Sequence, residues 1–289
     1  MSDKSERALM TAEQLAARLE DPSLRLFDTT VDMRAKPGGG YEIVSGRSQY
    51  EAGHIPGAAF LDLLADFSAD TPPLLFTLPS AQQFAAAAGA AGIGTGTTVV
   101  LYNAGPTWWA TRMWFMLREF GFDDAFVLDG GLDGWRADGR PLESGAARYT
   151  TASFPAGPRR KVFVNKLDVK SAVDAGNHAL LHALSPEVFS GKSPGSYARP
   201  GRIPGSCNVF AMHLLEPATK RFLPEAALRE QLGQAGLLEG KPVIAYCGGG
   251  ISATTDAFAL HLLGREDVQI YDGSLSEWAR DPAMPMETD

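Results

Sequence analysis

An internal duplication constrains the fold of this chain more than any other feature of its sequence. Three segments recur in the same order in both halves, about 145 residues apart: residues 53–58 and 201–206 (GHIPGA and GRIPGS), 99–103 and 243–247 (VVLYN and VIAYC), and 128–135 and 271–278 (LDGGLDGW and YDGSLSEW). Solenoid units are only about 20–50 residues long, so a repeat of this length is typical of a duplicated domain. We therefore expect two copies of one folding unit.

Short β-rich runs alternate with helical patterns in both halves. The runs predict strands at residues 24–28, 99–102 and 125–128, and again at 179–182, 243–246 and 268–271. The helical patterns cover residues 81–91, 108–120, 225–235 and 254–263. Such alternation is typical of an α/β fold, in which a mainly parallel sheet carries helices on both faces.

The 289 residues are enough for two domains of ordinary size. Residues 144–160 contain prolines and glycines and have no hydrophobic periodicity, which is typical of a linker. We therefore predict an N-terminal domain over residues 1–143, a linker over 144–160 and a C-terminal domain over 161–289.

The composition argues against membrane and nucleic-acid partners. Hydrophobic residues make up 45% of the chain, but none of the apolar runs is long enough to cross a bilayer. The polar first seven residues lead into a stretch without the features of a secretory signal, so the expected location is the cytoplasm. The formal net charge of −8 argues against a large nucleic-acid surface.

Cys247 is the candidate catalytic residue. It ends an apolar run and is followed by three glycines and then by residues able to begin a helix. The unpaired N–H groups of such a bend and the positive end of the helix favour a thiolate, the nucleophilic form of cysteine. The only other cysteine, Cys207, lies in an apolar strand-like run and is expected in the core. Two cysteines and five scattered histidines predict neither a disulfide framework nor a metal site.

On these residues the chain resembles the two-domain rhodanese-type sulfurtransferases, the family of thiosulfate and 3-mercaptopyruvate sulfurtransferases. The resemblance rests on the duplicated Gly-Xaa-Ile-Pro-Gly and Asp-Gly-Xaa-Leu-Xaa-Xaa-Trp segments and on a cysteine loop present only in the second copy. The first copy has Asn103 at the position of the nucleophile, and the N-terminal domains of the family characteristically lack a working cysteine there. The fold that this implies is two tandem rhodanese-like domains, the first one catalytically inactive.

The resemblance also implies a reaction and a set of loop residues. Cys247 takes a sulfane sulfur from a donor, becomes a persulfide and passes the sulfur to a thiophilic acceptor such as cyanide, a small thiol or the thiol of a protein. Neither a metal nor an organic cofactor is needed. Backbone N–H groups hold the anionic outer sulfur as an oxyanion hole would, and we expect them to come from Gly248, Gly249, Gly250, Ile251, Ser252 and Ala253.

The loop sequence C-G-G-G-I-S-A is closer to the mercaptopyruvate type (C-G-S/T-G-V-S/T-A) than to the thiosulfate type (C-R-K-G). Other positions depart from the family: His182-Ala183-Leu184 stands where Asp-Ala-Arg is frequent, Val188 where a substrate arginine occurs, and Phe76 near the place of a histidine. An anionic donor needs a cation, and the nearest candidates in sequence are Arg199 and Arg202. Two further candidates are His182 for proton transfer and Asp62, which matches an acidic residue of the family.

Two alternatives remain beside a sulfurtransferase with a small anionic donor. A cysteine phosphatase needs the pattern C-x5-R, because the arginine binds the phosphate with two hydrogen bonds. Here the sixth residue after the cysteine is Ala253, which argues against this alternative. A persulfide carrier would accept sulfur at Cys247 only from a protein partner, and the missing arginines keep this alternative open.

Overall fold

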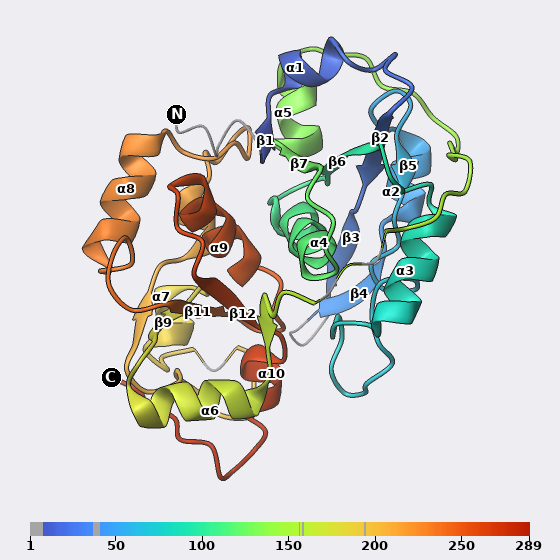
Figure 1. Ribbon diagram of the computed structural model, residues 1–289. Helices are drawn as coiled ribbons and strands as arrows, with labels where there is room; N and C mark the ends of the chain where they lie inside the picture. The colour runs from blue at the N-terminus through green and yellow to red at the C-terminus, as the bar shows by residue number, and fades with distance from the viewer. Residues whose placement is uncertain (1–7, 37–40, 156, 158, 194) are drawn as a thin grey trace.

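The computed structural model describes residues 8–36, 41–155, 157, 159–193 and 195–289 (Figure 1). The first seven residues, from which we predict the location, and residues 156 and 158 of the predicted linker lie outside this part of the chain. The described strands form two five-stranded sheets and one two-stranded antiparallel sheet. All pairings within the five-stranded sheets are parallel.

The two five-stranded sheets have the same topology. The first contains, in spatial order, β1 (Leu9–Met10), β7 (Ala125–Leu128), β6 (Thr98–Tyr102), β2 (Leu24–Asp28) and β5 (Ala59–Phe60). The second contains β8 (Phe163–Val164), β12 (Val268–Tyr271), β11 (Val243–Tyr246), β9 (Ala179–His182) and β10 (Ser206–Asn208). If the strands of each sheet are numbered 1 to 5 along the chain, their order in space is 1-5-4-2-3 in both sheets. The duplication read from the sequence is therefore a duplication of the fold.

Helices flank both sheets. The first half contains α1 (Ala12–Ala16), α2 (Arg47–Ala52), α3 (Ala81–Ala90), α4 (Trp108–Glu119) and α5 (Gly131–Ala137). The second contains α6 (Lys166–Ala175), α7 (Pro186–Phe189), the 3-10 helix η2 (Ala211–Leu214), α8 (Glu225–Gln234), α9 (Ala253–Leu262) and α10 (Ser274–Trp278). Short polar residues start several of them: Thr11 and Asn165 form capping boxes at α1 and α6, and Ser80 caps α3.

Three hydrophobic clusters place these helices on opposite faces of the sheets. Leu15 of α1 and Trp135 of α5 pack on one face of the first sheet, and Val169 of α6 and Trp278 of α10 pack on one face of the second. The largest cluster includes residues of both halves, and α4 and α9 contact each other within it (Figure 1). Both of these helices are buried over almost all of their length, because each lies between its own sheet and the other domain. The predicted α/β class with two tandem domains is confirmed.

The antiparallel sheet is a hairpin of β3 (Val31–Ala35) and β4 (Tyr41–Ser45) that we do not predict from the sequence. It belongs to the first half only. Residues 37–40, between the two strands in sequence, are not described.

The limits that we predict for the two domains, with the first ending at residue 143 and the second beginning at residue 161, stay predictions.

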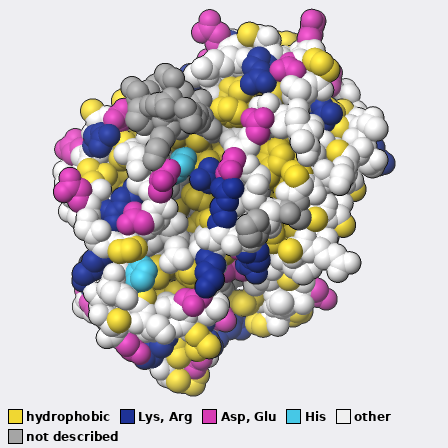
Figure 2. Space-filling model, in the orientation of Figure 1, with side chains coloured by type: hydrophobic (Ala, Val, Ile, Leu, Met, Phe, Trp, Pro, Cys, Tyr) yellow, Lys and Arg dark blue, Asp and Glu magenta, His cyan; other side chains and the backbone are white. Residues whose placement is uncertain are grey.

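The surface carries mixed charge. On the face shown in Figure 2, Lys and Arg side chains lie among Asp and Glu side chains. Among the described residues, none of the helices combines the length and apolar character needed to cross a bilayer.

Candidate functional site

Cys247 follows the last residue of β11, the central strand of the second sheet. All four residues of β11 are buried, as expected for the middle of a parallel sheet. The next five residues form the turn that leads into α9, which begins at Ala253. The Cys247 side chain is buried, with 2% of its surface exposed. It therefore lies at the carboxyl edge of the strands, where ligands bind in open α/β sheets.

The loop after Cys247 offers backbone N–H groups to an anion. The Ile251 N–H donates to Cys247 Sγ at 3.2 Å. Within the described part of the chain, the N–H groups of Gly248, Gly249, Ser252 and Ala253 donate no hydrogen bond. Unpaired N–H groups at the start of a helix are a ready anion site.

Ser274, at the start of α10, fixes the loop from behind. Its Oγ accepts from the N–H groups of Cys247 (3.1 Å) and Gly250 (3.0 Å) and donates to the Tyr271 carbonyl (2.7 Å). Ser274 has a φ of +47°, and Gly131 at the equivalent place in the first copy has +52°. The second Asp-Gly-Xaa-Leu segment therefore serves as the support of the cysteine loop.

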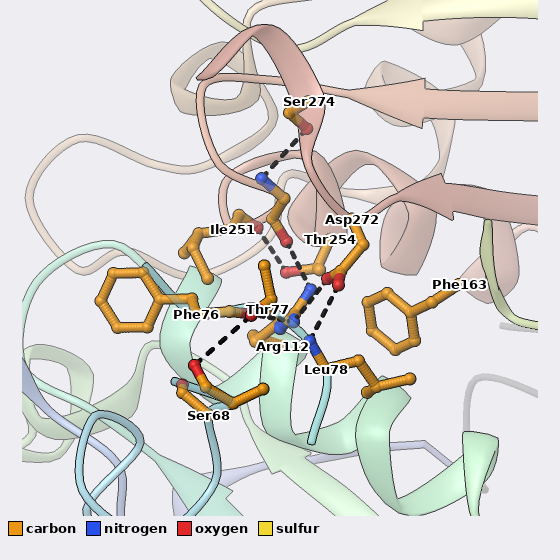
Figure 3. Close-up of polar contacts among 12 residues, drawn as sticks. Ser68, Phe76, Thr77, Leu78, Arg112, Phe163, Ile251, Thr254, Asp272 and Ser274 are labelled. Atoms are coloured by element: carbon orange, nitrogen blue, oxygen red, sulfur yellow. Dashed lines mark hydrogen bonds and ion pairs between the residues drawn. The ribbon is translucent and has the colours of Figure 1, made fainter. Parts of the chain in front are cut away.

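Arg112 holds the same loop from the other domain. This buried arginine of α4 donates to the Gly250 carbonyl at 3.1 Å, to Asp272 Oδ1 at 2.7 Å and to the Phe76 carbonyl. Asp272 Oδ2 in turn accepts from the Leu78 N–H at 2.8 Å. Figure 3 shows Arg112 between Phe76 and Phe163, and its guanidinium lies 4.4 Å from the centre of the Phe163 ring. The interdomain contact and the cysteine loop are thus one connected hydrogen-bond network.

A cavity of about 420 Å³ opens in front of the cysteine. The second domain contributes the loop residues Cys247, Gly248, Gly249, Ile251 and Ser252 and a wall of Leu184, Ser196, Tyr197, Phe210, Met212, Asp272, Gly273 and Ser276. The first domain contributes the hairpin residues Met33, Tyr41 and Ile43, the segment 73–76, and Trp108 and Trp109. The cavity therefore lies between the two domains, with the sulfur in its wall.

Both halves of the chain match the Rhodanese-like domain family, over residues 11–138 and 168–281. The chain belongs to the rhodanese family. It is 34% identical to the "Probable 3-mercaptopyruvate sulfurtransferase" of Pseudomonas aeruginosa over 98% of this chain and 99% of that protein. It is also 34% identical to the 3-mercaptopyruvate sulfurtransferase of Homo sapiens, over 94% and 92% of the two chains.

The fold of this rhodanese has solved counterparts. The crystal structure of SseA from Escherichia coli superposes with a TM-score of 0.80 at 31% identity, covering 93% of this chain and 99% of that one. Relatives named as sulfurtransferases over nearly the full length support sulfur transfer as its activity. This rhodanese is a sulfurtransferase.

Neither predicted substrate arginine lines the cavity of this rhodanese. Arg199 donates to four backbone carbonyls, those of Trp278, Ala279, Asp281 and Met284, at 2.6–3.1 Å. Arg202 pairs with Glu287 (2.5 Å) and Asp289 (2.7 Å) and lies over the Phe189 ring. Both guanidinium groups therefore hold the C-terminal segment on the second domain.

His182 ends β9 and is fully buried outside the cavity. Its ring packs edge-on against Tyr246 and Phe189, with ring centres 5.1 and 5.4 Å away. Burial, and next the positive charge of Arg202, lower the pKa of His182 to about 4. The imidazole is therefore neutral near pH 7 and has no direct path to the sulfur through the cavity.

Asp62, the fourth predicted residue, also lies outside the cavity wall. It accepts from Ser45 Oγ at 2.6 Å and from the N–H groups of Leu64 and Ala65. The carboxylate that does reach the cavity is Asp272. Sequence reasoning missed Arg112, Asp272, Ser274 and Tyr197, although the arginine in the otherwise apolar run of α4 and the repeated Asp-Gly segment were available signals.

Proposed function

We propose that this sulfurtransferase works through a persulfide on Cys247. Support comes most directly from the position of Sγ, which lies in the cavity wall and accepts the Ile251 N–H at 3.2 Å. Asn103 occupies the equivalent position in the first domain, and its amide is fully engaged there with Ala104, Pro106 and Ala110. Chemistry at the second copy only is consistent with this difference.

In the first step, the Cys247 thiolate attacks the outer sulfur of the donor. A bond forms between Sγ and that sulfur, while the donor loses its bond to the sulfur and leaves with the electron pair. In the second step, cyanide or a thiolate attacks the outer sulfur, and the S–S bond breaks to restore the Cys247 thiolate. Between the steps the outer sulfur is anionic, and the unpaired N–H groups of Gly248, Gly249, Ser252 and Ala253 can stabilise it.

The first donor to test is 3-mercaptopyruvate, because the relatives carry it in their names and the loop pattern is closer to that type. Thiosulfate is the second. The acceptor is a small thiol or cyanide, or the thiol of a protein.

Intact mass spectrometry tests the persulfide. The protein is incubated with each donor without acceptor, and we expect a species heavier by about 32 daltons, from one added sulfur atom. Cys247→Ser should show no such species, while Cys207→Ser should form it as the wild type does. Addition of cyanide should return the mass to its original value and release thiocyanate. If neither donor adds mass but a persulfide-bearing protein does, the chain is a persulfide carrier instead.

A further inference from the structure

The described lining of the cavity at Cys247 offers no cation to a substrate. Among its described lining residues only Asp272 has a charged side chain, and that carboxylate already accepts from Arg112 and from the Leu78 N–H. Arg112 itself is buried behind the loop and uses its guanidinium on Asp272 and on the Gly250 and Phe76 carbonyls. A second negative charge on a donor, such as a carboxylate, would therefore be desolvated in this cavity without an ion partner.

The wall is instead aromatic and aliphatic. Phe76 and Trp109 are buried and pack with ring centres 5.0 Å apart, and Trp108 and Phe210 extend the same surface. Such a surface binds the uncharged part of an organic molecule.

The rim of the cavity is apolar as well. Five large hydrophobic side chains are exposed in the described part of the chain, and three of them line this cavity: Met33 (39%), Tyr41 (58%) and Leu75 (53%). The first two lie on β3 and β4, and the third lies in the segment before Phe76. Exposed apolar side chains gathered at one opening indicate a binding surface.

We propose that the cavity selects organic sulfur compounds that have a single negative charge on the reacting group and an uncharged aromatic or branched aliphatic body. This rests on the proposed function. The loop N–H groups receive the charged sulfur, and the apolar wall receives the body.

An aryl thiosulfonate, R–SO₂–S⁻, fits this description and gives a balanced step. The Cys247 thiolate attacks the terminal sulfur, the Sγ–S bond forms, and the S–S bond of the donor breaks. The sulfinate R–SO₂⁻ leaves with the electron pair, and the persulfide anion remains on the enzyme. Two negative charges are present before and after the step, and no proton moves.

The test compares benzenethiosulfonate with methanethiosulfonate, since the two donors have the same charge and reacting group and differ only in the body. With cyanide as acceptor and thiocyanate as the measured product, we expect kcat/KM to be at least about 10-fold higher for benzenethiosulfonate, as for other apolar specificity pockets. Equal or higher kcat/KM for methanethiosulfonate would overturn this inference and leave the persulfide mechanism intact. Absence of a Cys247 persulfide with every donor would instead contradict the proposed function.

Substitutions at the rim of the cavity test whether its exposed apolar side chains cause the preference for benzenethiosulfonate. The double variant Tyr41→Ser, Leu75→Ser should raise KM for benzenethiosulfonate by about 5-fold, from lost apolar contact area, and should raise KM for methanethiosulfonate less, because its methyl group has less apolar area to lose. Leu167→Ser is the matched control, because Leu167 is exposed but lies outside the cavity. An equal change in KM for both donors, or no change for either, would count against the rim as a specificity surface.

Discussion

At the scale of single residues, the glycines of the cysteine loop have different roles. Gly250 has a φ of +72°, and a Cβ there would lie 2.5 Å from the Asp272 carbonyl oxygen. At Gly249 a Cβ would meet no atom within 4 Å, and its backbone is outside the left-handed region. Gly250 is therefore required by the turn, whereas Gly249 faces open space.

This difference predicts opposite results for two matched variants. Gly250→Ala should lower kcat/KM by about 10-fold or more, because displacement of the loop misplaces the sulfur and its N–H donors. Gly249→Ala should form the persulfide as readily as the wild type. Persulfide formation followed by intact mass and steady-state rates with the same donor would measure both. Similar losses in the two variants would show that the positive φ is not the cause.

His182 predicts a pH dependence of stability. Its pKa is about 4 in the folded protein, below the value of about 6.5 for an unfolded histidine. As the pH falls, His182 therefore binds its proton at a higher pH in the unfolded chain than in the folded protein. The contribution of neutral His182 to the free energy of unfolding, which is fully present above about pH 6.5, is lost between about pH 6.5 and 4. The free energy of unfolding should fall there by up to about 1.4 kcal/mol per pH unit from this residue.

Urea unfolding of His182→Phe at several pH values checks this expectation. The phenyl ring keeps the contact with Tyr246 and Phe189 but cannot titrate, so the slope between pH 6.5 and 4 should be smaller than in the wild type. His213→Gln, at an exposed position, is the control. An unchanged slope in His182→Phe would contradict the prediction.

At the scale of elements, α4 of the first domain positions the cysteine loop of the second. Replacement of Arg112 by Met leaves the Asp272 carboxylate without its ion partner and the Gly250 carbonyl without its donor. Breaking a buried pair in this way costs about 3–5 kcal/mol. We expect Arg112→Met to lower the free energy of unfolding by that amount and also to lower kcat, since the loop loses its support.

A surface ion pair of the same length provides the control for Arg112. Arg34 and Asp32 are also 2.7 Å apart, but the arginine is 55% exposed. Exposed pairs contribute at most about 1 kcal/mol, so Arg34→Met should change neither stability nor kcat noticeably. Chemical unfolding and steady-state rates apply to both variants. Equal effects of the two substitutions would show that Arg112 does not act through the buried network.

Elements with a clear period could be predicted from the sequence. The strand expected at residues 243–246 and the helices expected at 108–120 and 225–235 lie within one residue of their observed limits. Edge strands such as β1 and β8 could not be predicted, because each has only two residues, too few to show the alternation of a strand. The β3–β4 hairpin is also not predicted from the sequence, because the pairing of its two strands is known only from the structure.

The site was predictable only where one segment builds it. The position of Cys247 at a strand end and its turn follow from local sequence. The other wall comes from Phe76 and the hairpin, and Arg112 supports the loop from behind. All of these are distant from the loop in sequence and reach it only when the domains pack together. Arg199 and Arg202 are the arginines nearest in sequence to the place of the family's substrate arginine, but in the structure their guanidinium groups contact the C-terminal segment.

At the scale of the whole molecule, the two domains share one core. Trp114 of α4 packs edge-on against Phe258 of α9, with ring centres 5.0 Å apart, and Thr111 and Thr254 hydrogen-bond at 2.7 Å. The buried carboxylate of Glu119 accepts from the Val162 and Phe163 N–H groups at the start of the second sheet. Separation of the domains would expose apolar surface on both, so neither is expected to keep its stability alone.

The shared core predicts a single unfolding transition for both domains. In calorimetry the van't Hoff enthalpy should equal the measured enthalpy, as for a two-state protein. Leu15→Ala tests the coupling, because Leu15 is buried in the first domain away from the interface and its truncation costs about 2–5 kcal/mol. Coupled domains should still unfold together, at a Tm lowered by several degrees. Independent domains would instead give two transitions, with only the first shifted by the substitution, and that outcome would place the stabilising contacts within each domain and not between them.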